Sequence, residues 1–476
     1  MPIQRDTLLA GFAPATTLTP ADVVAARGTR ARQLVVLDDD PTGTQSVADL
    51  PVLNSWAPED LAWAFRTGAA AVYVMTNSRS LDPVEAERRN REVARAALTA
   101  AASLGIDVDF VSRSDSTLRG HFPLEPRTLV EELGATGVAT DGIVIVPAFG
   151  DAGRITVNSI HYAGNDAAGY VPVGETEFAK DATFGYHSSD LRDWVEEKSG
   201  GTLPAGDVVA ITLDELRADR AAALAKLTAV ANATPVVVDI VEESDLRALA
   251  LTLLEAEEGG KRFVYRVGPP FVRAMIGQAE HAPLTAADVA GISHAETRPG
   301  GLVVVGSHVG LTTRQLDALR ERRRPVEFEI DVAAVLGEQR DAHLEDVVAR
   351  VAAALDHGNV VIRTSRTLVR GVDGADSLRI ARAVSDAVVT VVRRVLDVAR
   401  PRFVIAKGGI TSSDVAARGL EIGRAMVRGP MLPGIVSLWE PIEGPARGIP
   451  YIVFAGNVGT DESLADVTDI LSTPKN

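Results

Sequence analysis

Three consecutive carboxylates end a short apolar run near the start of the chain. Leu34–Leu37 precedes Asp38, Asp39 and Asp40, and the turn sequence Pro41-Thr42-Gly43 follows them. This order predicts a buried strand that delivers the acids to the carboxyl edge of an α/β sheet, where such folds bind ligands. A solvated acidic turn is the alternative. Because adjacent carboxylates repel one another, we expect a cation or a hydrogen-bonding substrate to offset them.

A second group of polar residues follows another apolar run. It combines two guanidinium groups, Arg113 and Arg119, with the carboxylate of Asp115 and the hydroxyls of Ser116 and Thr117. Arginine binds carboxylates and phosphates bidentately, while carboxylate and hydroxyl groups suit the hydroxyls of a sugar. The group therefore indicates a site for a small polyhydroxy acid. Surface ion pairs on a capped loop are the alternative.

A glycine-rich loop after the apolar run 143–146 is a weaker candidate. It carries Asp151 and Arg154, and Arg154 would add positive charge to a site, but an ordinary β-turn explains the loop equally well. His121 and His161 lack paired ligands in the sequence, which is more typical of structural or solvated histidines. We predict no histidine metal cluster and identify no metal ligand.

Three strand-like runs in the second half of the chain end in glycine-containing turns. They are Val305-Gly306-Ser307, Ala406-Lys407-Gly408-Gly409 and Phe454-Ala455-Gly456-Asn457. After the middle turn, Thr411 and Ser412 open a helix, which would point backbone N–H groups and hydroxyls at an anion. Neither a G-x-x-x-x-G-K-[ST] nor a G-x-G-x-x-G run is present, so a phosphate would bind without a P-loop. The apolar segment 426–435 would either wall an adenine or form a core loop.

Strand-like and helix-like segments alternate between these candidate sites. Expected strands are 34–37, 71–75, 108–112, 143–146, 208–211, 236–239 and 263–267 in the first half, and 302–305, 326–330, 360–363, 403–406 and 452–454 in the second. Asp82 and Pro83 predict the start of a long helix that Gly105 ends, and an apolar stripe predicts a helix over 377–399. Residues 1–30 are expected to be a helical lead-in. The alternation predicts an α/β fold with two lobes, each a mainly parallel sheet flanked by helices.

Composition narrows the classes of function. The 476 residues carry a net charge of −16, which argues against binding to nucleic acid or anionic membranes, so a site for an anion must be locally positive. There is no cysteine, which excludes disulfides, thiolate catalysis and cysteine metal sites. No run reaches the ~18 apolar residues of a membrane span, and no signal peptide is recognised, so we expect a cytoplasmic protein.

The polar segments resemble blocks of the four-carbon acid sugar kinase family. Asp39-Asp40-Pro41-Thr42-Gly43 is similar to its Asp-Asp-x-Thr-Gly motif, and Asp115-Ser116-Thr117-Leu118-Arg119-Gly120 matches its Asp-Ser-Thr-Leu-Arg-Gly signature. The segments 146–156, 408–412 and 456–459 resemble three further blocks in the same order. Departures are Arg113 in place of the usual Lys, His121 in place of Asn, and Ile410 at a commonly acidic position.

The resemblance implies an ATP-dependent kinase for threonate, erythronate or 3-oxotetronate, with Mg²⁺ as cofactor. A substrate domain, 1–285, would face a nucleotide domain, 296–476, across an active-site cleft. Asp115 or Asp39 would orient or deprotonate the attacking hydroxyl. With the residue patterns above, the substrate side comprises Asp40, Thr42, Arg113, Ser116, Arg119 and Arg154. The ATP side comprises Ser307, Ser365, Gly408, Gly409, Thr411, Ser412, Gly456 and Asn457.

Two other functions compete with this hypothesis. Asp38, Asp40 and Thr42 also fit the Asp-x-Asp-x-Thr motif of haloacid dehalogenase-like phosphatases, in which Asp38 would be the nucleophile and Asp40 the acid/base. A catalytically silent sugar-acid or nucleotide sensor is the other. The sequence leaves open the acid, the hydroxyl and the stereochemistry, and the oligomeric state, with a homodimer among the options.

Overall fold

The chain divides into two compact units that are discontinuous in sequence. The structure is a computed structural model that describes residues 2–28, 32–292, 296–365 and 374–473. Unit 1 comprises Met1–Gly43 and Trp56–Glu280, and unit 2 comprises Thr44–Ser55 and His281–Asn476. The short segment Thr44–Ser55 thus belongs with the second half of the chain, although the sequence suggests a single crossing between the two halves.

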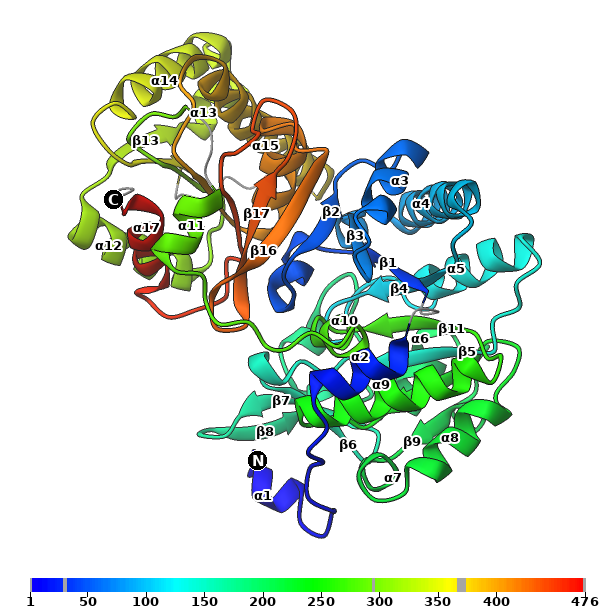
Figure 1. Cartoon of the computed structure of the whole chain (residues 1–476). Coiled ribbons are helices and arrows are strands. Elements are labelled where there is room, and N and C mark those ends of the chain that lie inside the picture. The colour runs from blue at the N-terminus through cyan, green and yellow to red at the C-terminus, as the bar shows by residue number, and fades with distance from the viewer. Residues whose placement is uncertain (1, 29–31, 293–295, 366–373, 474–476) are drawn as a thin grey trace. The chain divides into compact units, whose positions relative to one another are not determined.

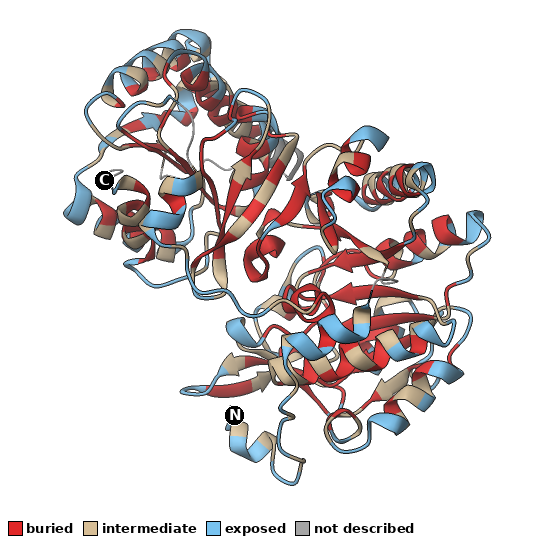
Figure 2. Cartoon of the chain, in the orientation of Figure 1, coloured by how far each residue is buried: buried red, intermediate tan, exposed pale blue. Residues whose placement is uncertain are grey.

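Unit 1 is built on a seven-stranded parallel sheet in the order β3-β1-β4-β11-β5-β10-β9 (Figure 1). The strands are β1 (Gln33–Asp38), β3 (Ala71–Met75), β4 (Val108–Arg113), β5 (Gly142–Val146), β9 (Val209–Ile211), β10 (Thr234–Val238) and β11 (Phe263–Val267). Their apolar runs are buried on both faces, as Figure 2 shows, and this is why they read as continuous hydrophobic segments. The structure confirms the predicted α/β class.

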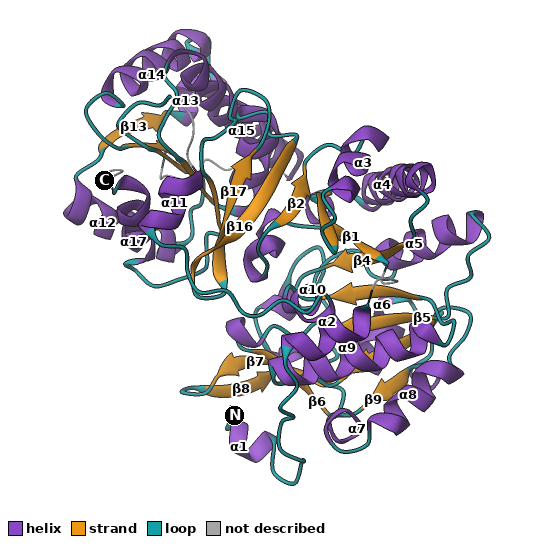
Figure 3. Cartoon of the chain, viewed as in Figure 1, coloured by secondary structure: helices purple, strands orange, loops and turns teal. Residues whose placement is uncertain are grey.

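Two groups of helices flank this sheet (Figure 3). α3 (Pro58–Arg66), α4 (Pro83–Leu104) and α5 (Leu124–Ala135) pack together, and α2 (Pro20–Arg27), α8 (Arg220–Ala229), α9 (Glu243–Glu258) and α10 (Pro270–Met275) form the second group. The unit also contains α1 (Arg5–Leu8), α6 (Leu191–Lys198) and α7 (Leu213–Arg217). Asp82 caps α4 by accepting from the N–H of Glu85, and Gly105 ends it at φ +66°.

The helical lead-in predicted for residues 1–30 is wrong in extent. Within residues 2–28, which the structure describes, only α1 and α2 are helical, and the chain between them is irregular. Gly11 adopts φ +91° and Pro14 lacks a backbone N–H, so both break a helix. Thr19 then begins α2 as its cap, accepting from the N–H of Asp22.

A small antiparallel sheet in unit 1 was not predicted. It is formed by β6 (Arg154–Val157), β7 (Ile160–Asn165) and β8 (Gly169–Pro172). The two residues between β6 and β7, Asn158 and Ser159, have φ of +53° and +64°, as a two-residue hairpin turn requires. The strands are short and carry polar and glycine residues, so no apolar period indicated them.

Unit 2 contains a mixed sheet in the order β13-β14-β12-β15-β18-β17-β16-β2. The first five strands are parallel: β12 (Leu302–Val305), β13 (Val326–Ile330), β14 (Val360–Thr364), β15 (Val404–Lys407) and β18 (Tyr451–Phe454). The last three are antiparallel: β2 (Leu50–Leu53), β16 (Arg424–Leu432) and β17 (Ile435–Pro441). The apolar segment 426–435 is thus mostly a sheet hairpin.

The strand β2 explains why Thr44–Ser55 belongs to unit 2. It pairs with β16, and Thr44 forms a buried hydrogen-bonded cluster with Ser437 and Trp439 of β17. The Thr44 and Ser437 hydroxyls are 2.8 Å apart, and the Trp439 indole donates to Thr44 at 2.9 Å. The chain therefore leaves unit 1 directly after the carboxylates Asp38–Asp40, which lie in that unit.

The helices of unit 2 alternate with its parallel strands. They are α11 (Ala286–Ile292), α12 (Gly310–Arg323), α13 (Val332–Leu336), α14 (Arg340–Ala354), α15 (Gly374–Val398), α16 (Gly409–Asp414) and α17 (Ser463–Ser472). The predicted apolar stripe of α15 is buried at Ile380, Ala387, Val391 and Val395. Within the described residues, no helix combines the length and apolar character that a membrane span needs.

Candidate active site

The carboxyl ends of β3, β1 and β4 lie side by side in unit 1 and carry most of its charged residues. Asp38 is the last residue of β1 and Arg113 the last residue of β4, and the two are paired in the parallel register. The segment after β3 adds Arg79. The sheet therefore brings together residues that are far apart in sequence, as predicted for the two acidic and basic segments.

Asp38 and Arg113 form a buried ion pair at the ends of β1 and β4. Asp38 is fully buried and Arg113 is 3% exposed, and Arg113 Nη2 donates to Asp38 Oδ1 and to the carbonyl of Asp40. A Cβ on Gly43 would overlap both Asp38 Oδ2 and the Arg113 guanidinium, so this turn requires glycine. Arg113 is thus committed to the protein and turned away from solvent.

Arg79 is the centre of the charged network and was not predicted as a site residue. Its Nη2 and Nε donate to both carboxylate oxygens of Asp39 at 2.6 and 3.0 Å. Its Nη1 lies 3.6 Å from Asp40 and 3.9 Å from Asp115. One guanidinium thus offsets the repulsion of three carboxylates. A sequence signal existed, because Arg79 follows a strand expected to lie in the same sheet as β1.

The pKa values of two carboxylates next to Arg79 are shifted in opposite directions. Burial raises the pKa of Asp39, the Arg79 guanidinium opposes this rise, and two nearby carboxylates add to it. Burial acts in the same direction on Asp115. There, however, the charges of Arg79 and Arg119 and the hydrogen bonds from Arg119 and Thr117 outweigh it and hold the pKa below its usual range. Asp115 is therefore ionised at neutral pH.

The turn after β4 presents Asp115 at the surface of the site. Asp115 Oδ2 accepts from the Thr117 hydroxyl and from Arg119 Nε, the latter at 2.8 Å. Its Oδ1 has a more distant neighbour, Arg79 at 3.9 Å. Leu118 adopts φ +68°, which is unusual for a bulky side chain and tightens the turn. Oδ1 is thus the carboxylate oxygen best able to accept from a ligand.

Buried polar side chains hold this turn through its carbonyl groups. Tyr186 donates its hydroxyl to the carbonyl of Thr117 at 2.6 Å, and His161 Nε2 lies 2.8 Å from the carbonyl of Ser116. Arg266 Nη2 donates to the carbonyl of Arg119 at 3.3 Å. Burial lowers the pKa of His161 to about 4, so its ring is neutral at physiological pH. His161 is structural, as the sequence favoured.

An aromatic ring lies close to both outer arginines of the site. Phe178 lies 5.4 Å from the Arg119 guanidinium and 5.5 Å from that of Arg154, measured to the ring centroid. Arg119 also approaches Asp181 at 3.7 Å. Arg154 donates to the carbonyl of Ala152, and no carboxylate among the described residues forms an ion pair with it. Arg154 is the guanidinium of this cluster whose charge is least offset.

Two further groups complete the site of unit 1. Asp40 is 22% exposed in its side chain and accepts from the N–H and hydroxyl of Thr42 at 3.0 and 2.6 Å, so Thr42 orients this carboxylate.

Glu125, at the start of α5, is buried and accepts from Ser78. His121 Nε2 lies 3.1 Å from the carbonyl of Ser78. Glu125 was not predicted, because no motif marks it. Ser116 is nearly buried.

In unit 2, the three predicted glycine turns meet at the carboxyl ends of β12, β15 and β18. A Cβ on Gly456 would lie 2.5 Å from Ser307 Oγ, and one on Gly408 would lie 3.5 Å from Ser307 Cβ. Thr312 of α12 joins two of the turns: its hydroxyl donates to the carbonyl of Gly456 at 2.9 Å and lies 3.1 Å from Ser307 Oγ. Gly408 adopts φ +129°, which favours glycine. The turns form a close-packed backbone surface.

The other predicted nucleotide residues have different surroundings. Gly409 begins α16, and Thr411 lies next to Gly408, 3.1 Å from the position of its Cβ. Ser412 is buried and donates to the carbonyl of Ala406 at 2.8 Å, so its hydroxyl serves the protein. Asn457 is exposed. Ser365, at the end of β14, donates to Glu329 at 2.8 Å and accepts from the N–H of Val332.

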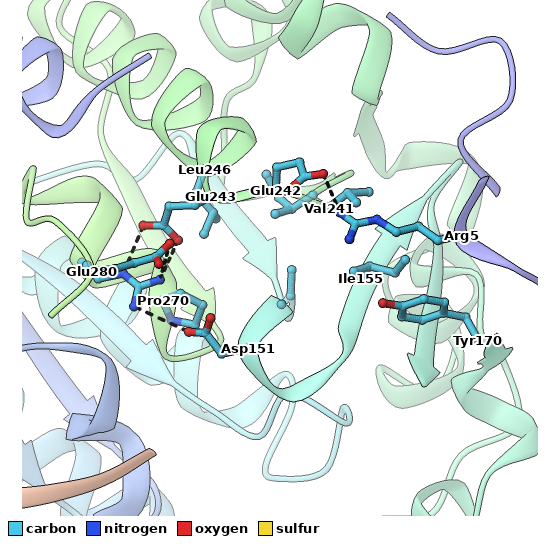
Figure 4. Close-up of a pocket in the computed structure, with 14 residues that line it drawn as sticks. Arg5, Asp151, Ile155, Tyr170, Val241, Glu242, Glu243, Leu246, Pro270 and Glu280 are labelled. Atoms are coloured by element: carbon cyan, nitrogen blue, oxygen red, sulfur yellow. Dashed lines mark hydrogen bonds and ion pairs between the residues drawn. The ribbon is translucent and has the colours of Figure 1, made fainter. Parts of the chain in front are cut away.

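A separate cavity of about 190 Å³ lies in unit 1 near the ends of β5, β10 and β11 (Figure 4). Arg273 meets Glu243 at 2.7 Å and approaches Asp151 and Glu280, and Arg5 pairs with Glu242. Four carboxylates thus face two guanidinium groups. This excess of negative charge disfavours an acidic substrate, which the arginine-rich group around Asp115 suits better.

Two domain profiles of known proteins match successive parts of the chain. The profile of a sugar-binding N-terminal domain matches residues 34–275, and that of a nucleotide-binding C-terminal domain matches residues 302–464. A D-erythronate kinase of Heliobacterium modesticaldum is 28% identical over 427 residues, covering 84% of this chain and 87% of its own. A D-threonate kinase of Salmonella typhimurium is 27% identical over 365 residues, covering 74% and 78%.

Solved structures share the fold. A protein of Salmonella typhimurium LT2 described as a putative tRNA synthase aligns with a TM-score of 0.66 at 19% identity, covering 91% of this chain and 98% of its own. A Haemophilus influenzae protein aligns with a TM-score of 0.61 at 18% identity, covering 92% and 100%. At these identities the similarity concerns architecture alone.

Proposed function

Because the chain belongs to the four-carbon acid sugar kinase family, we propose that it transfers the terminal phosphoryl group of ATP to a hydroxyl of a four-carbon sugar acid. D-Erythronate and D-threonate are the first candidates, since they are the substrates named for two relatives. The observation that carries the proposal is the ionised Asp115, held at the end of β4 by Arg79 and Arg119. ATP as donor implies a cytoplasmic reaction.

Arg154 is the group we propose for the substrate carboxylate. Arg79, Arg113 and Arg119 each pair with an aspartate of the protein, whereas Arg154 pairs with no carboxylate among the described residues. Arg154 Nε is buried and has no hydrogen-bond partner. A guanidinium with unused donors binds a carboxylate in a defined orientation. Arg119, which is 26% exposed and also lies close to Phe178, would assist it.

Asp115 is the group we propose to orient and deprotonate the attacking hydroxyl. Its Oδ2 is used by Thr117 and Arg119, which leaves Oδ1 to accept from the substrate. A carboxylate that stays ionised is a weak base, but phosphoryl transfer depends mainly on positioning and charge. Asp39, whose two oxygens both bind Arg79, would act as the anchor of that arginine.

The glycine turns of unit 2 are proposed to bind the phosphates of ATP. Gly408 and Gly456 lack side chains where a Cβ would crowd Thr411 or Ser307, so the backbone of these turns can approach a ligand closely, although the N–H of Gly408 itself donates to the carbonyl of Phe454. Mg²⁺ in such enzymes needs only one or two protein carboxylates besides phosphate oxygens. No group of three or more metal-ligating side chains occurs among the described residues, which is compatible with this smaller requirement. Bound Mg²⁺ would neutralise phosphate charge.

A coupled assay for ADP tests the proposal. Purified protein with ATP, Mg²⁺ and a panel of four-carbon sugar acids should release ADP with at least one acid, and mass spectrometry should find the phosphorylated product. Asp115→Asn should lower kcat by roughly 10²–10⁴-fold with the fold intact by circular dichroism. Asp166→Asn, which alters an exposed ion pair with Arg5, is the matched control and should leave kcat unchanged.

Three results would reject this function. Absence of ADP release with every acid of the panel rejects the kinase. A covalent phosphate trapped on Asp38 would instead support the phosphatase alternative, which the complete burial of Asp38 against Arg113 disfavours. ATP binding without product would select the sensor.

A further inference from the structure

A lysine lies buried directly in front of the central glycine turn of unit 2. Lys407 is the last residue of β15, is 0% exposed, and precedes Gly408 and Gly409. Its Nζ donates to the carbonyl of Ala455 at 2.7 Å and lies 3.7 Å from the centroid of the Phe454 ring. One ammonium group therefore connects the turn after β15 with the turn after β18.

No carboxylate among residues 2–28, 32–292, 296–365 and 374–473 forms an ion pair with Lys407. The charged groups on the neighbouring elements are engaged elsewhere: Arg314 of α12 pairs with Asp461 at 2.8 Å, and Asp414 of α16 accepts from Ser385. His308, which follows β12, is exposed. A buried charge without a counter-ion is costly, and the Phe454 ring offsets only part of that cost.

We propose that Lys407 is a positioning residue whose counter-ion is the phosphate chain of the bound nucleotide. Its ammonium holds the carbonyl of Ala455, which orients the Ala455–Gly456 turn, and its charge adds to the attraction of the three glycine turns for an anion. The inference rests on the proposed function, because it names the anion that the site accepts as ATP.

The pH dependence of binding separates this role from a purely structural one. Burial lowers the pKa of Lys407 to about 7, so part of the population lacks the charge at neutral pH. A bound phosphate chain favours the ammonium form, so binding takes up a proton. ATP affinity should therefore fall as pH rises from 7 to 9, and calorimetry in buffers of different ionisation enthalpy should detect proton uptake near pH 7.5.

Three variants of the full-length protein test the proposal by calorimetry with MgATP. Lys407→Met should bind at least 10-fold more weakly at pH 6.5 and lose the linked proton uptake. Lys407→Arg keeps the charge at every pH, so its affinity should stay nearly constant between pH 7 and 9. Lys226→Met, which alters a lysine paired with Glu215 in unit 1, is the control and should behave as the wild type.

The outcomes distinguish this inference from the proposed function. If the wild type does not bind MgATP, the proposed function fails and the inference fails with it. If the wild type binds but Lys407→Met binds equally well with the same pH profile, the inference alone is overturned. Should Lys407→Met not fold, Lys407→Arg decides: an affinity that falls above pH 7 as in the wild type overturns the role of the Lys407 charge.

Discussion

The two units differ in how their charged side chains are paired. Around Asp115 in unit 1, carboxylates and guanidinium groups offset one another, with Arg79 shared between Asp39, Asp40 and Asp115. At the glycine turns of unit 2, the main protein charge is the buried Lys407, which has no carboxylate partner among the described residues. Most charges of the unit 1 site are therefore paired within the protein before a substrate binds, with Arg154 as the exception, whereas in unit 2 the charge of Lys407 would be balanced by the ligand.

This difference indicates how each unit would select its ligand. A network of paired side chains fixes atoms in advance, which suits the selection of one hydroxyl and one carboxylate of a small acid. Backbone turns can approach phosphate oxygens closely but recognise little beyond charge and shape. Substrate identity should thus depend on unit 1, and the strength of nucleotide binding on unit 2.

Removing Arg79 should give the largest effect, because it breaks the balance of unit 1. Arg79→Met removes the bidentate partner of the buried Asp39 and leaves it only Arg113, which lies 3.4 Å away and already pairs with Asp38. Loss of one member of a buried pair costs about 3–5 kcal/mol in the free energy of unfolding. We also expect kcat to fall by roughly 10³-fold, since Asp115 loses one of the two charges that orient it.

A double variant checks the cause of this loss. Chemical denaturation of Arg79→Met/Asp39→Asn should show that removing the carboxylate charge restores part of the stability, while activity stays low. Equal stability of the single and double variants would mean that Asp39 and Arg79 do not depend on each other.

A methyl group in a glycine turn should have the next largest effect, on nucleotide affinity. Gly456→Ala would put a Cβ 2.5 Å from Ser307 Oγ, so the turns must move apart. We expect MgATP to bind roughly 10-fold more weakly, about 1.4 kcal/mol, with the KM for the sugar acid unchanged. Gly358→Ala, whose Cβ would meet nothing within 4 Å, is the matched control. A change in the KM for the sugar acid instead would contradict the assignment of acid binding to unit 1 and nucleotide binding to unit 2.

The sequence predicted the parallel strands and the polar groups at their ends, but not the pairing within the site. Apolar runs such as 71–75, 263–267 and 302–305 match the observed strands because buried parallel strands are continuously hydrophobic. The hairpin of β16 and β17 and the strand β2 depend on partners far away in sequence. Arg79 and Lys407 were not predicted as site residues for the same reason. Their roles depend on contacts between segments that follow different strands, and no local motif marks such contacts.

The stability of the ligand-free protein should also reflect the unbalanced charge of unit 2. The pKa of Lys407 is lowered from 10.5 to about 7, so between these pH values the unfolded chain binds more protons than the folded protein. The free energy of unfolding should therefore rise with pH from 7 to about 10. Lys407→Met should be more stable than the wild type by roughly 1–4 kcal/mol at pH 6.5, and this gain should shrink toward pH 10. Thermal melts at several pH values measure it, and a variant less stable at every pH would contradict an uncompensated charge.

The smallest effect should come from the ring that contacts two arginines in unit 1. Phe178 contacts the guanidinium groups of Arg119 and Arg154, and a cation–π contact at a partly exposed site contributes about 0.5–1 kcal/mol. Phe178→Leu keeps an apolar side chain but removes the ring quadrupole, so we expect the KM for the sugar acid to rise roughly 2–5-fold with kcat nearly unchanged. Phe178→Tyr retains the ring and should restore the wild-type KM, because the quadrupole and not the exact shape orients the arginines. If the leucine variant instead lowered kcat and left KM unaltered, Arg154 and Arg119 would serve the transition state and not the binding of the acid. The division between binding by the outer arginines and catalysis by Asp115 would then have to be redrawn.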